Sequence, residues 1–459
     1  MDRHLLPIAL LLLFALLHPA TAPAQVIAAG GLHSIAVCTD NTAMDWGDND
    51  NGQLGNGSFT NSNVPVPVSS LTAVIAVAGS QSHSLALKND GTVWAWGINS
   101  LGMLGNGDNA DSNIPVQASG LAGAIAIAAG RYHSLAVQND GTVWTWGSNI
   151  LGELGNGTAV ESNVPVQAIG LAGMIAVAGG YHYSLALKSD GTVWAWGGNG
   201  AGQFGNGTNA DSSVPVQVSS LTGITAIAAG FDFSLALKND NTLWAFGTND
   251  YGQLGDGSTL GSNIPVQVSG LAGVVSIEVG DYHSLAVKQD GTVWAWGENF
   301  SGQLGDGSTT DSPVPVQVGP LTGITAVAGG TRFSLALKND GTIWGCGENF
   351  YGSLGNGTNT SSSVPVQVTG LCAVGTGVEE LSDAASYTVF PNPTTGRITV
   401  QGPVGTQQLE IRDVLGQEIH RSAVTGVSAE IDLSSQPNGI YFLAIHIAHS
   451  VRSVKLIKN

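Results

Sequence analysis

A single glycine recurs every 50 residues along most of the chain, and this fixed period limits the possible fold more than any other feature. The recurring positions are Gly47, Gly97, Gly147, Gly197, Gly247, Gly297 and Gly347. An LGNG, LGDG or FGNG string follows each of them. The chain therefore contains seven copies of one unit without an insertion or a deletion, which indicates a repeat architecture in which each copy forms one supersecondary unit.

Each copy contains four short apolar segments that are separated by turns. In the second copy these segments cover residues 74–78, 84–88, 92–96 and 114–118, and their length and turn residues predict β-strands. An Asp-Gly or Asp-Asn pair lies between the second and third segments of every copy. Such a pair favours a two-residue hairpin in which both central residues have positive φ. Seven copies of four antiparallel strands predict an all-β fold, a seven-bladed β-propeller.

The pattern within a copy also predicts where each strand lies in its blade. The first segment is rich in alanine and glycine, which suits the crowded strand beside the central channel. Trp94 and Trp96 alternate along the third segment, so both indoles lie on one face of that strand. We expect this face to pack against the neighbouring blade.

The repeated string resembles the regulator-of-chromosome-condensation repeat. In the third copy it runs from "AAGRYHSLAVQNDGTVWTWG" to "LGELGNG". The resemblance covers about residues 26–374 and implies a seven-bladed propeller. It does not define the function, because this family's fold serves exchange factors, photoreceptors, ubiquitin-ligase modules and a secreted bacterial inhibitor of β-lactamase.

The N-terminal residues have the pattern of a secretory signal peptide. Arg3 and His4 precede an apolar run at 5–17, and a small-x-small cleavage site lies at 22–24. We therefore predict a signal peptide over 1–24 and a mature propeller over 25–374. The mature chain should contain no membrane span and should reach a compartment that permits disulfides.

A different pattern begins after the last copy. Residues 375–386 are small, acidic and turn-rich, which predicts a linker. Alternating strands and turns over 387–459 predict a small β-sandwich. Its FPNP, DVLG, NGIY and terminal KLIK strings resemble the C-terminal sorting domain of the type IX secretion system. The resemblance implies a Gram-negative secretor, the type IX machinery as a partner, and a secreted or cell-surface location reached through the periplasm.

The charge of the chain argues against several classes of partner. Lys and Arg number 14 against 33 Asp and Glu, so the net charge is −19. Such a charge repels phosphate backbones and anionic membrane surfaces, so we expect no nucleic-acid partner. A nucleotide-exchange function conflicts with both the signal peptide and this charge.

Residues that recur in every copy are expected to be structural. A histidine precedes a recurring serine in four copies, but tyrosine or phenylalanine replaces it in the other three, and a general base cannot be replaced by phenylalanine. These residues are His33, His83, His133 and His283, against Tyr183, Phe233 and Phe333. The string at 48–52 resembles the opening of a calcium loop, but Phe59 stands where such a loop needs a bidentate glutamate. We expect no catalytic residue, no metal and no cofactor.

Three cysteines remain to be placed. Cys346 stands at a core position that tryptophan or phenylalanine fills in other copies, so it should be a buried thiol. Cys38 ends the second strand of the first copy, and Cys372 follows the fourth strand of the last. Ring closure brings these two copies together, so one expectation is a disulfide and the other is two unpaired thiols.

The turns after the first strand are where the copies differ most. The up-and-down order of strands places them on one face, together with the long loop that carries the LGNG string. Aromatic and arginine side chains are typical of binding hot spots. The alternative is that these are surface positions that have diverged without a binding role. The candidate ligand-binding or partner-binding residues are Arg131, Tyr132, Tyr181, His182, Phe231, Asp232, Asp281, Tyr282 and Arg332.

These features favour an exported, non-enzymatic recognition or adhesion propeller that binds an extracellular protein or glycan through its variable turns. The alternative is a secreted glycan-active lyase or hydrolase. Such an enzyme would use an asymmetric group on the same face, such as His182, Asp232 and Asp281.

Overall fold

The computed structural model describes residues 26–218, 220–372, 388–390, 397–401, 406–413, 418–425, 428–437, 439–447 and 450–458. The chain divides into two compact units, residues 1–378 and 379–459. The predicted signal peptide at 1–24 and the predicted linker at 375–386 lie outside the described residues. No helix in the described ranges is long and apolar enough to cross a membrane.

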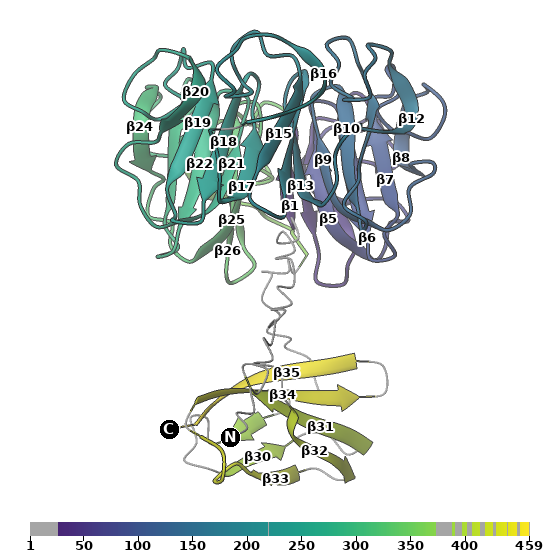
Figure 1. Ribbon diagram of the computed structural model, residues 1–459, viewed down its shortest axis with the longest axis vertical. Helices are drawn as coiled ribbons and strands as arrows, with labels where there is room; N and C mark the ends of the chain where they lie inside the picture. Colours follow the sequence, from purple (N-terminus) through teal and green to yellow (C-terminus); the bar gives the residue numbers. More distant parts are fainter. Residues whose placement is uncertain are drawn as a thin grey trace, which may run out of the picture. The chain divides into compact units, whose positions relative to one another are not determined.

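The first unit is a seven-bladed β-propeller (Figure 1). Every blade is a four-stranded antiparallel sheet whose strands follow the chain order from the inside outward. Blades one to three contain β1 (Ile27–Ala29), β2 (His33–Val37), β3 (Ala43–Gly47) and β4 (Ser62–Pro67); β5 (Val74–Gly79), β6 (His83–Lys88), β7 (Val93–Gly97) and β8 (Ser112–Gln117); β9 (Ala124–Ala129), β10 (His133–Gln138), β11 (Val143–Gly147) and β12 (Ser162–Gln167). Blades four and five contain β13 (Met174–Gly179), β14 (Tyr183–Lys188), β15 (Val193–Gly197) and β16 (Ser212–Gln217); β17 (Ile224–Ala229), β18 (Phe233–Lys238), β19 (Leu243–Gly247) and β20 (Ser262–Gln267). Blades six and seven contain β21 (Val274–Val279), β22 (His283–Lys288), β23 (Val293–Gly297) and β24 (Ser312–Gln317); β25 (Ile324–Gly329), β26 (Phe333–Lys338), β27 (Ile343–Gly347) and β28 (Ser362–Gln367).

The hairpin between the second and third strands differs from the one expected. Only the second residue of each Asp-Gly or Asp-Asn pair has positive φ, for example Gly91 at 77° and Asn41 at 61°. The Gly91 N–H donates to the Lys88 carbonyl and the Lys88 N–H donates to that of Thr92. The connection is thus a turn followed by one left-handed residue, and the prediction of a two-residue turn with two positive φ angles was wrong. Asp90 stays at negative φ, and its carboxylate accepts bonds from the N–H and the hydroxyl of Thr92.

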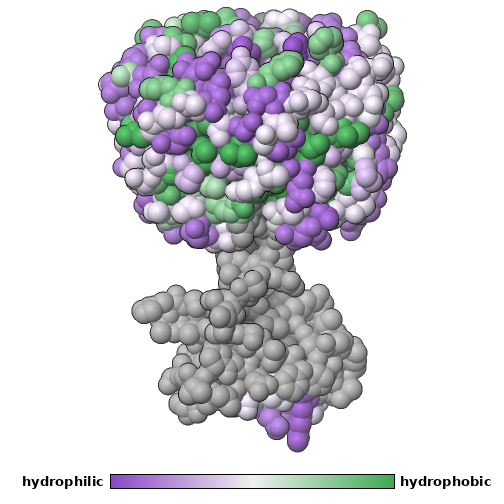
Figure 2. Space-filling view, turned by 180° about the vertical axis from the view of Figure 1, so that it is seen from behind, coloured by the Kyte–Doolittle hydropathy of each residue, from purple (hydrophilic) through white to green (hydrophobic). Residues whose placement is uncertain are grey.

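The outermost strand of each blade is the edge of its sheet, and both proline and the long loop of the preceding blade protect it, as where the Gly57 N–H donates to the Asn113 carbonyl of β8. All of these strands contain at least one proline at their centre, such as Pro115 in β8. Proline offers no N–H to an incoming strand, so it prevents edge-to-edge pairing between molecules. On the side shown in Figure 2, hydrophobic residues form separate patches over the propeller wall rather than one continuous area.

Adjacent blades are joined by the third-strand tryptophans. Trp96 is fully buried against apolar residues of the first blade. Its indole N–H donates to the Gln53 carbonyl in the long loop of that blade, at 2.7 Å. Tryptophans at the same position in four other blades make the corresponding bond. The expected packing of this face against the neighbouring blade is confirmed.

A second set of bonds between blades involves the recurring histidine and serine. His83 Nε2 lies 2.9 Å from Ser134 Oγ in the next blade, and Ser134 Oγ donates to the Met103 carbonyl at 2.8 Å. Both side chains are fully buried. Where phenylalanine replaces histidine, as at Phe233, the serine of the next blade keeps its carbonyl acceptor. The pairs are therefore structural links between blades.

The ring closes where the first blade meets the seventh. The Trp46 indole N–H donates to the Ser353 carbonyl at 2.8 Å, and the Thr331 N–H donates to the Gly31 carbonyl at 3.1 Å. Cys38 and Cys372 form a disulfide across this junction, with their Cα atoms 5.7 Å apart.

Replacing Cys38 and Cys372 together by serine should lower the free energy of unfolding by about 2–4 kcal/mol, because the disulfide restricts the unfolded chain over a separation of 334 residues. Urea unfolding of both proteins under oxidising conditions measures the difference. Reduction of the wild-type protein should produce the same loss. An unchanged midpoint and slope in the double variant would contradict the expected contribution.

The second unit contains two small sheets. The strands of one, in the order of the sheet, are β29 (Thr388–Phe390), β30 (Arg397–Gln401) and β33 (Ser428–Asp432). Those of the other are β32 (Glu418–Thr425), β31 (Thr406–Asp413), β34 (Gly439–Ile447) and β35 (Ser450–Lys458). Side chains from both sheets, including Val400, Ile411 and Leu443, form one buried core. This arrangement fits the predicted small β-sandwich.

Candidate binding site at the channel mouth

Seven three-residue turns surround one end of the central channel, and we call them the mouth turns: residues 30–32, 80–82, 130–132, 180–182, 230–232, 280–282 and 330–332. Each begins with a small residue. A Cβ on Gly180, for example, would lie 2.0 Å from the Tyr183 ring, so only glycine fits at this position beside the ring. In each blade the long loop begins directly after the third strand, and the N–H of its first residue donates to the carbonyl of the last residue of the mouth turn. In the third blade these residues are Ser148 and Tyr132. The mouth turns and the long loops therefore share one face, as expected.

Six hydrogen bonds between neighbouring blades connect all seven mouth turns into an open belt. The bonds, given with the donor first, are Gly31 N to Ser80 O, Ser80 Oγ to Arg131 O, Arg131 N to Gly180 O, Tyr181 N to Phe231 O, Phe231 N to Asp281 O and Thr331 N to Gly31 O, with lengths of 2.8–3.1 Å. Backbone atoms provide all of these groups except the Ser80 hydroxyl. The side chains of the mouth turns are thus presented from a backbone that is already fixed before any ligand arrives.

Aromatic side chains of four consecutive blades form a continuous row on this face. Tyr181 stacks on Phe231 with ring centroids 4.0 Å apart. Tyr132 lies 5.8 Å from Tyr181, and Tyr282 lies 5.0 Å from Phe231. Four of the candidate residues named from the sequence are therefore brought into direct contact, and all of them are half-buried.

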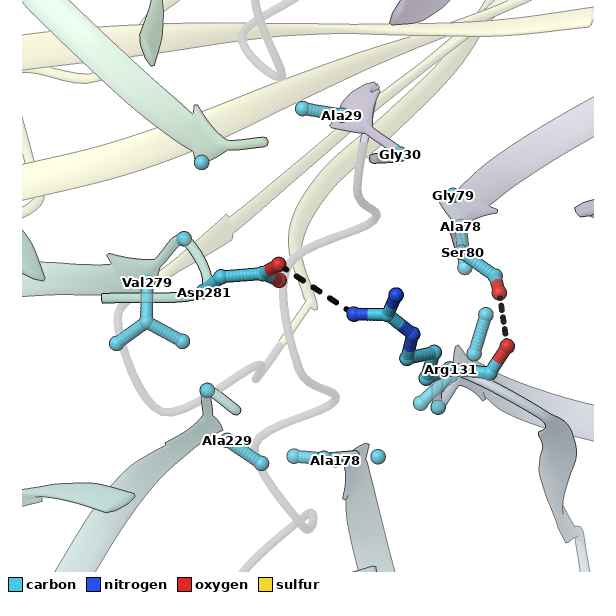
Figure 3. A pocket seen from close by; sticks show the side chains of 18 of the residues that line it. Ala29, Gly30, Ala78, Gly79, Ser80, Arg131, Ala178, Ala229, Val279 and Asp281 are labelled. Atoms are coloured by element: carbon cyan, nitrogen blue, oxygen red, sulfur yellow. Dashed lines mark hydrogen bonds and ion pairs between the residues drawn. The ribbon is translucent and has the colours of Figure 1, made fainter. Parts of the chain in front are cut away.

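Arg131 extends from the third blade towards the sixth across the channel mouth (Figure 3). Its guanidinium lies 5.0–5.6 Å from the ring centroids of Tyr132, Tyr181 and Phe231. Arg131 Nη1 is 3.8 Å from Asp281 Oδ2, and the two side chains are 28% and 26% exposed. At that distance the pair is an ion pair without a short hydrogen bond. Burial raises the pKa of Asp281, and the positive charge of Arg131 opposes this shift.

Beneath this ion pair the inner strands enclose a cavity of about 160 Å³. Glycine, alanine and other neutral residues form nearly all of its lining, and its charged residues are Arg131, Asp281 and Glu278. Burial raises the pKa of the Glu278 carboxyl to about 7. Glu278 was not among the candidate residues predicted from the sequence. The signal was present, because alanine stands at this position in the other six copies.

His182 is held by Glu153, a second residue that was not predicted from the sequence. Glu153 is fully buried, and its Oε1 lies 3.2 Å from His182 Nδ1. The Ser148 hydroxyl and the Leu151 N–H also donate to this carboxylate. Burial by itself would raise the pKa of Glu153, but the bonds from His182 and Ser148, with the nearby His133, bring it to about 2. A charged glutamate therefore fixes the orientation of the His182 ring.

The remaining candidate residues have separate partners. Asp232 accepts a bond from Gln203 Nε2 at 2.9 Å, and burial raises its pKa to about 6. Arg332 Nε is 3.4 Å from Glu298 Oε1. Among the described residues, no hydrogen bond or ion pair joins any two of His182, Asp232 and Asp281. No cluster of three or more potential metal ligands occurs in the described ranges.

The long loops place further apolar side chains outside the mouth turns. Phe300, Phe350 and Ile150 are 74%, 68% and 61% exposed. The Arg332 guanidinium lies 5.8 Å from the Phe300 ring centroid. These residues belong to the variable positions of the long loops, and they extend the candidate surface from the channel towards the rim.

Family profiles agree with this geometry. The RCC1-like domain matches residues 123–384, and the regulator of chromosome condensation (RCC1) repeat matches 45–87 and 90–137, with a second profile of that repeat at 25–53 and 74–102. The chain belongs to the RCC1-like domain family. A secretion system C-terminal sorting domain matches residues 388–459 of the same RCC1-like chain.

Solved structures share the propeller fold of the RCC1-like unit. Human WBSCR16 is 25% identical, with a TM-score of 0.60 over 66% of this chain and 83% of that one. Yeast RCC1 (Prp20) bound to Kap60 is 23% identical, with a TM-score of 0.64 over 75% and 85%. Prp20p from Saccharomyces cerevisiae, described with its binding to Gsp1p and histones, is 23% identical, with a TM-score of 0.63 over 75% and 87%. No curated protein matches the chain in a sequence search.

Together these findings confirm the resemblance to the chromosome-condensation repeat, the seven-bladed all-β fold and the C-terminal sorting domain. The sorting domain indicates type IX secretion to the cell surface or the extracellular space. The RCC1-like protein is therefore a secreted propeller. The ligand-binding role of the mouth turns stays a prediction.

Proposed function

We propose that this RCC1-like propeller is a recognition or adhesion protein that binds an extracellular protein or glycan through its mouth turns. One observation supports this function above the others. The turns that differ most between copies are gathered at one channel mouth, where a hydrogen-bonded belt fixes their backbone. A rigid surface with half-buried aromatic and arginine side chains loses little conformational entropy when it binds.

The alternative function, a glycan-active lyase or hydrolase, needs acid and base groups that converge on one reacting atom. The buried Glu153 next to His182 resembles an oriented base. However, Asp232 pairs with Gln203 and Asp281 with Arg131, so the three proposed groups are held by different partners. We therefore favour binding. A protein partner is also consistent with the yeast relative, whose structure was solved bound to Kap60.

Replacing Tyr132, Tyr181, Phe231 and Tyr282 by serine should reduce capture of the extracellular partner at least tenfold, because their aromatic contact area is lost. Full-length protein is immobilised and exposed to surface and secreted material from the native habitat, and the captured amounts are compared.

A matched control replaces exposed apolar residues at the start of the inner strands, the end away from the mouth turns: Ile75, Ile125 and Val275, each by serine. This variant should capture as much as the wild type. We call the protein with all four aromatic residues replaced by serine the mouth variant. Equal capture by the mouth variant and the wild type would refute the proposed function.

A further inference from the structure

The channel mouth already contains a cation held by aromatic rings and a carboxylate. The Arg131 guanidinium lies within 5.6 Å of three ring centroids and 3.8 Å from Asp281. Stacking over aromatic rings beside a carboxylate is the usual way in which proteins recognise ammonium and guanidinium groups. The mouth therefore has the chemistry of a cation site, and the chain's own arginine demonstrates that a guanidinium fits its upper part.

The charges of the cavity lining do not balance. Asp281 and Glu278 are both carboxylates, and Arg131 is the one cation among the lining residues. Arg131 is paired with Asp281, which leaves Glu278 without a counter-charge. Among the described residues, no ion pair includes Glu278, and its Oε2 accepts a bond only from the Val279 N–H next to it, at 3.2 Å.

Glu278 also departs from the repeat in a way that the fold does not require. The equivalent residue in every other blade is alanine, for example Ala228 and Ala328, which pack against the inner strand of the following blade. A carboxylate at this position has an unfavourable desolvation free energy that alanine avoids. The cavity beside it, at about 160 Å³, is well above the roughly 10–15 Å³ that a cavity needs to hold one water molecule, so a side-chain-sized group can enter.

We infer that the mouth cavity binds the cationic side chain of a lysine or arginine presented by a partner protein. Glu278 is the counter-charge for the incoming cation, and Tyr181 and Phe231 form the apolar wall that its methylene groups contact. Arg131 lies over the entrance, 3.8 Å from Asp281, and the incoming side chain displaces its guanidinium as it enters. This inference rests on the proposed function and names the chemistry that the mouth turns recognise in a partner.

The test measures binding of capped single amino acids to full-length protein by ligand-observed NMR at pH 8, where the Glu278 carboxyl is mostly ionised. The probes are Nα-acetyl-arginine methylamide and Nα-acetyl-lysine methylamide. Their neutral counterparts are the citrulline and norleucine derivatives. The cationic probes should bind at least tenfold more tightly than the neutral ones, and Glu278→Ala should abolish this preference.

Glu278→Ala introduces the residue that six blades already contain, so the variant should fold normally. Glu278→Gln keeps the shape of the side chain and should lose the same preference. Glu161→Ala is the matched control, because it removes an equal charge from an exposed position on a long loop, and it should bind the probes as the wild type does.

Equal binding of cationic and neutral probes, or unchanged cation binding by Glu278→Ala, would overturn the inference. If Glu278→Ala also captures the extracellular partner as well as the wild type does, while the mouth variant does not, the proposed function stands and only the cation site is refuted. If the mouth variant captures normally, the proposed function itself fails.

Discussion

Acidification from pH 7.5 to pH 5 should destabilise the propeller by several kcal/mol, and replacing one buried histidine by phenylalanine should reduce that loss. His33, His83 and His283 are fully buried, and burial lowers their pKa from 6.5 to about 3. Burial also lowers the pKa of His133, to about 4. These rings stay neutral in the folded protein, whereas the unfolded chain takes up protons below about pH 6.5.

The sign of this effect follows from the lowered pKa values. The stabilising contribution is complete above pH 6.5 and is lost progressively as the pH falls towards the folded-state values near 3 and 4. At pH 5 each buried histidine should lower the free energy of unfolding by about 2 kcal/mol relative to its value above pH 6.5. The four together approach the whole stability of an ordinary domain. Urea unfolding at a series of pH values measures how the free energy of unfolding changes with pH.

His283→Phe provides the matched test, because phenylalanine already occupies this position in the fifth and seventh blades, as Phe233 and Phe333, and the mouth turn of the sixth blade likewise begins with glycine. The serine of the following blade would keep its carbonyl acceptor. Between pH 7.5 and pH 5 the free energy of unfolding should fall by about 2 kcal/mol less in the variant than in the wild type. Parallel curves of unfolding free energy against pH for the two proteins between pH 7.5 and 4 would show that His283 does not contribute to acid unfolding.

Asp45→Ala should raise the free energy of unfolding at pH 7 by about 1–3 kcal/mol, the usual cost of a buried polar group without a hydrogen-bond partner. Asp45 lies in β3, is fully buried, and neither carboxylate oxygen has a hydrogen-bond partner. Burial raises its pKa well above the ordinary value. The unfavourable contribution is therefore absent below about pH 3.8 and grows as the pH rises towards the folded-state pKa, which is opposite to the effect of the histidines.

Other blades show which residues this position accepts. Alanine occupies it in four of them, as at Ala95, and Thr145 occupies it in the third, where its hydroxyl donates to the Leu154 carbonyl at 2.7 Å. Asp45→Thr should therefore also stabilise the folded propeller. The reverse change, Ala95→Asp, should destabilise the second blade by a similar amount at pH 7. Thermal unfolding at pH 7 and pH 4 measures all three variants, and a loss of stability in Asp45→Ala at pH 7 would disprove this account.

Much of the fold could be predicted because its determinants recur within 50 residues. The alternation of Trp94 and Trp96 identified the face that packs between blades. The replacement of histidine by phenylalanine at Phe233 separated structural residues from candidate functional ones. The hairpin at Asp90 was predicted incorrectly, because an Asp-Gly pair suits several turn types and the choice between them depends on the full length of the connection.

The candidate site was predicted less completely. The mouth turns could be identified because they vary between copies and follow the first strand. Glu153 and Glu278 were overlooked because each looked like one more substitution in a repeated segment. Their positions became apparent only when the structure placed Glu153 against His182 and Glu278 in the lining of the channel cavity.

The sequence by itself determined the number of blades, the order of strands and the export of this protein, because strand period, turn residues and sorting strings are local properties of the chain. Only the tertiary structure decided that Arg131 faces Asp281 across the channel and that Cys38 is bonded to Cys372. The physical reason is ring closure. It brings together residues from non-adjacent copies, and the distances between their side chains depend on the curvature of all the blades between them.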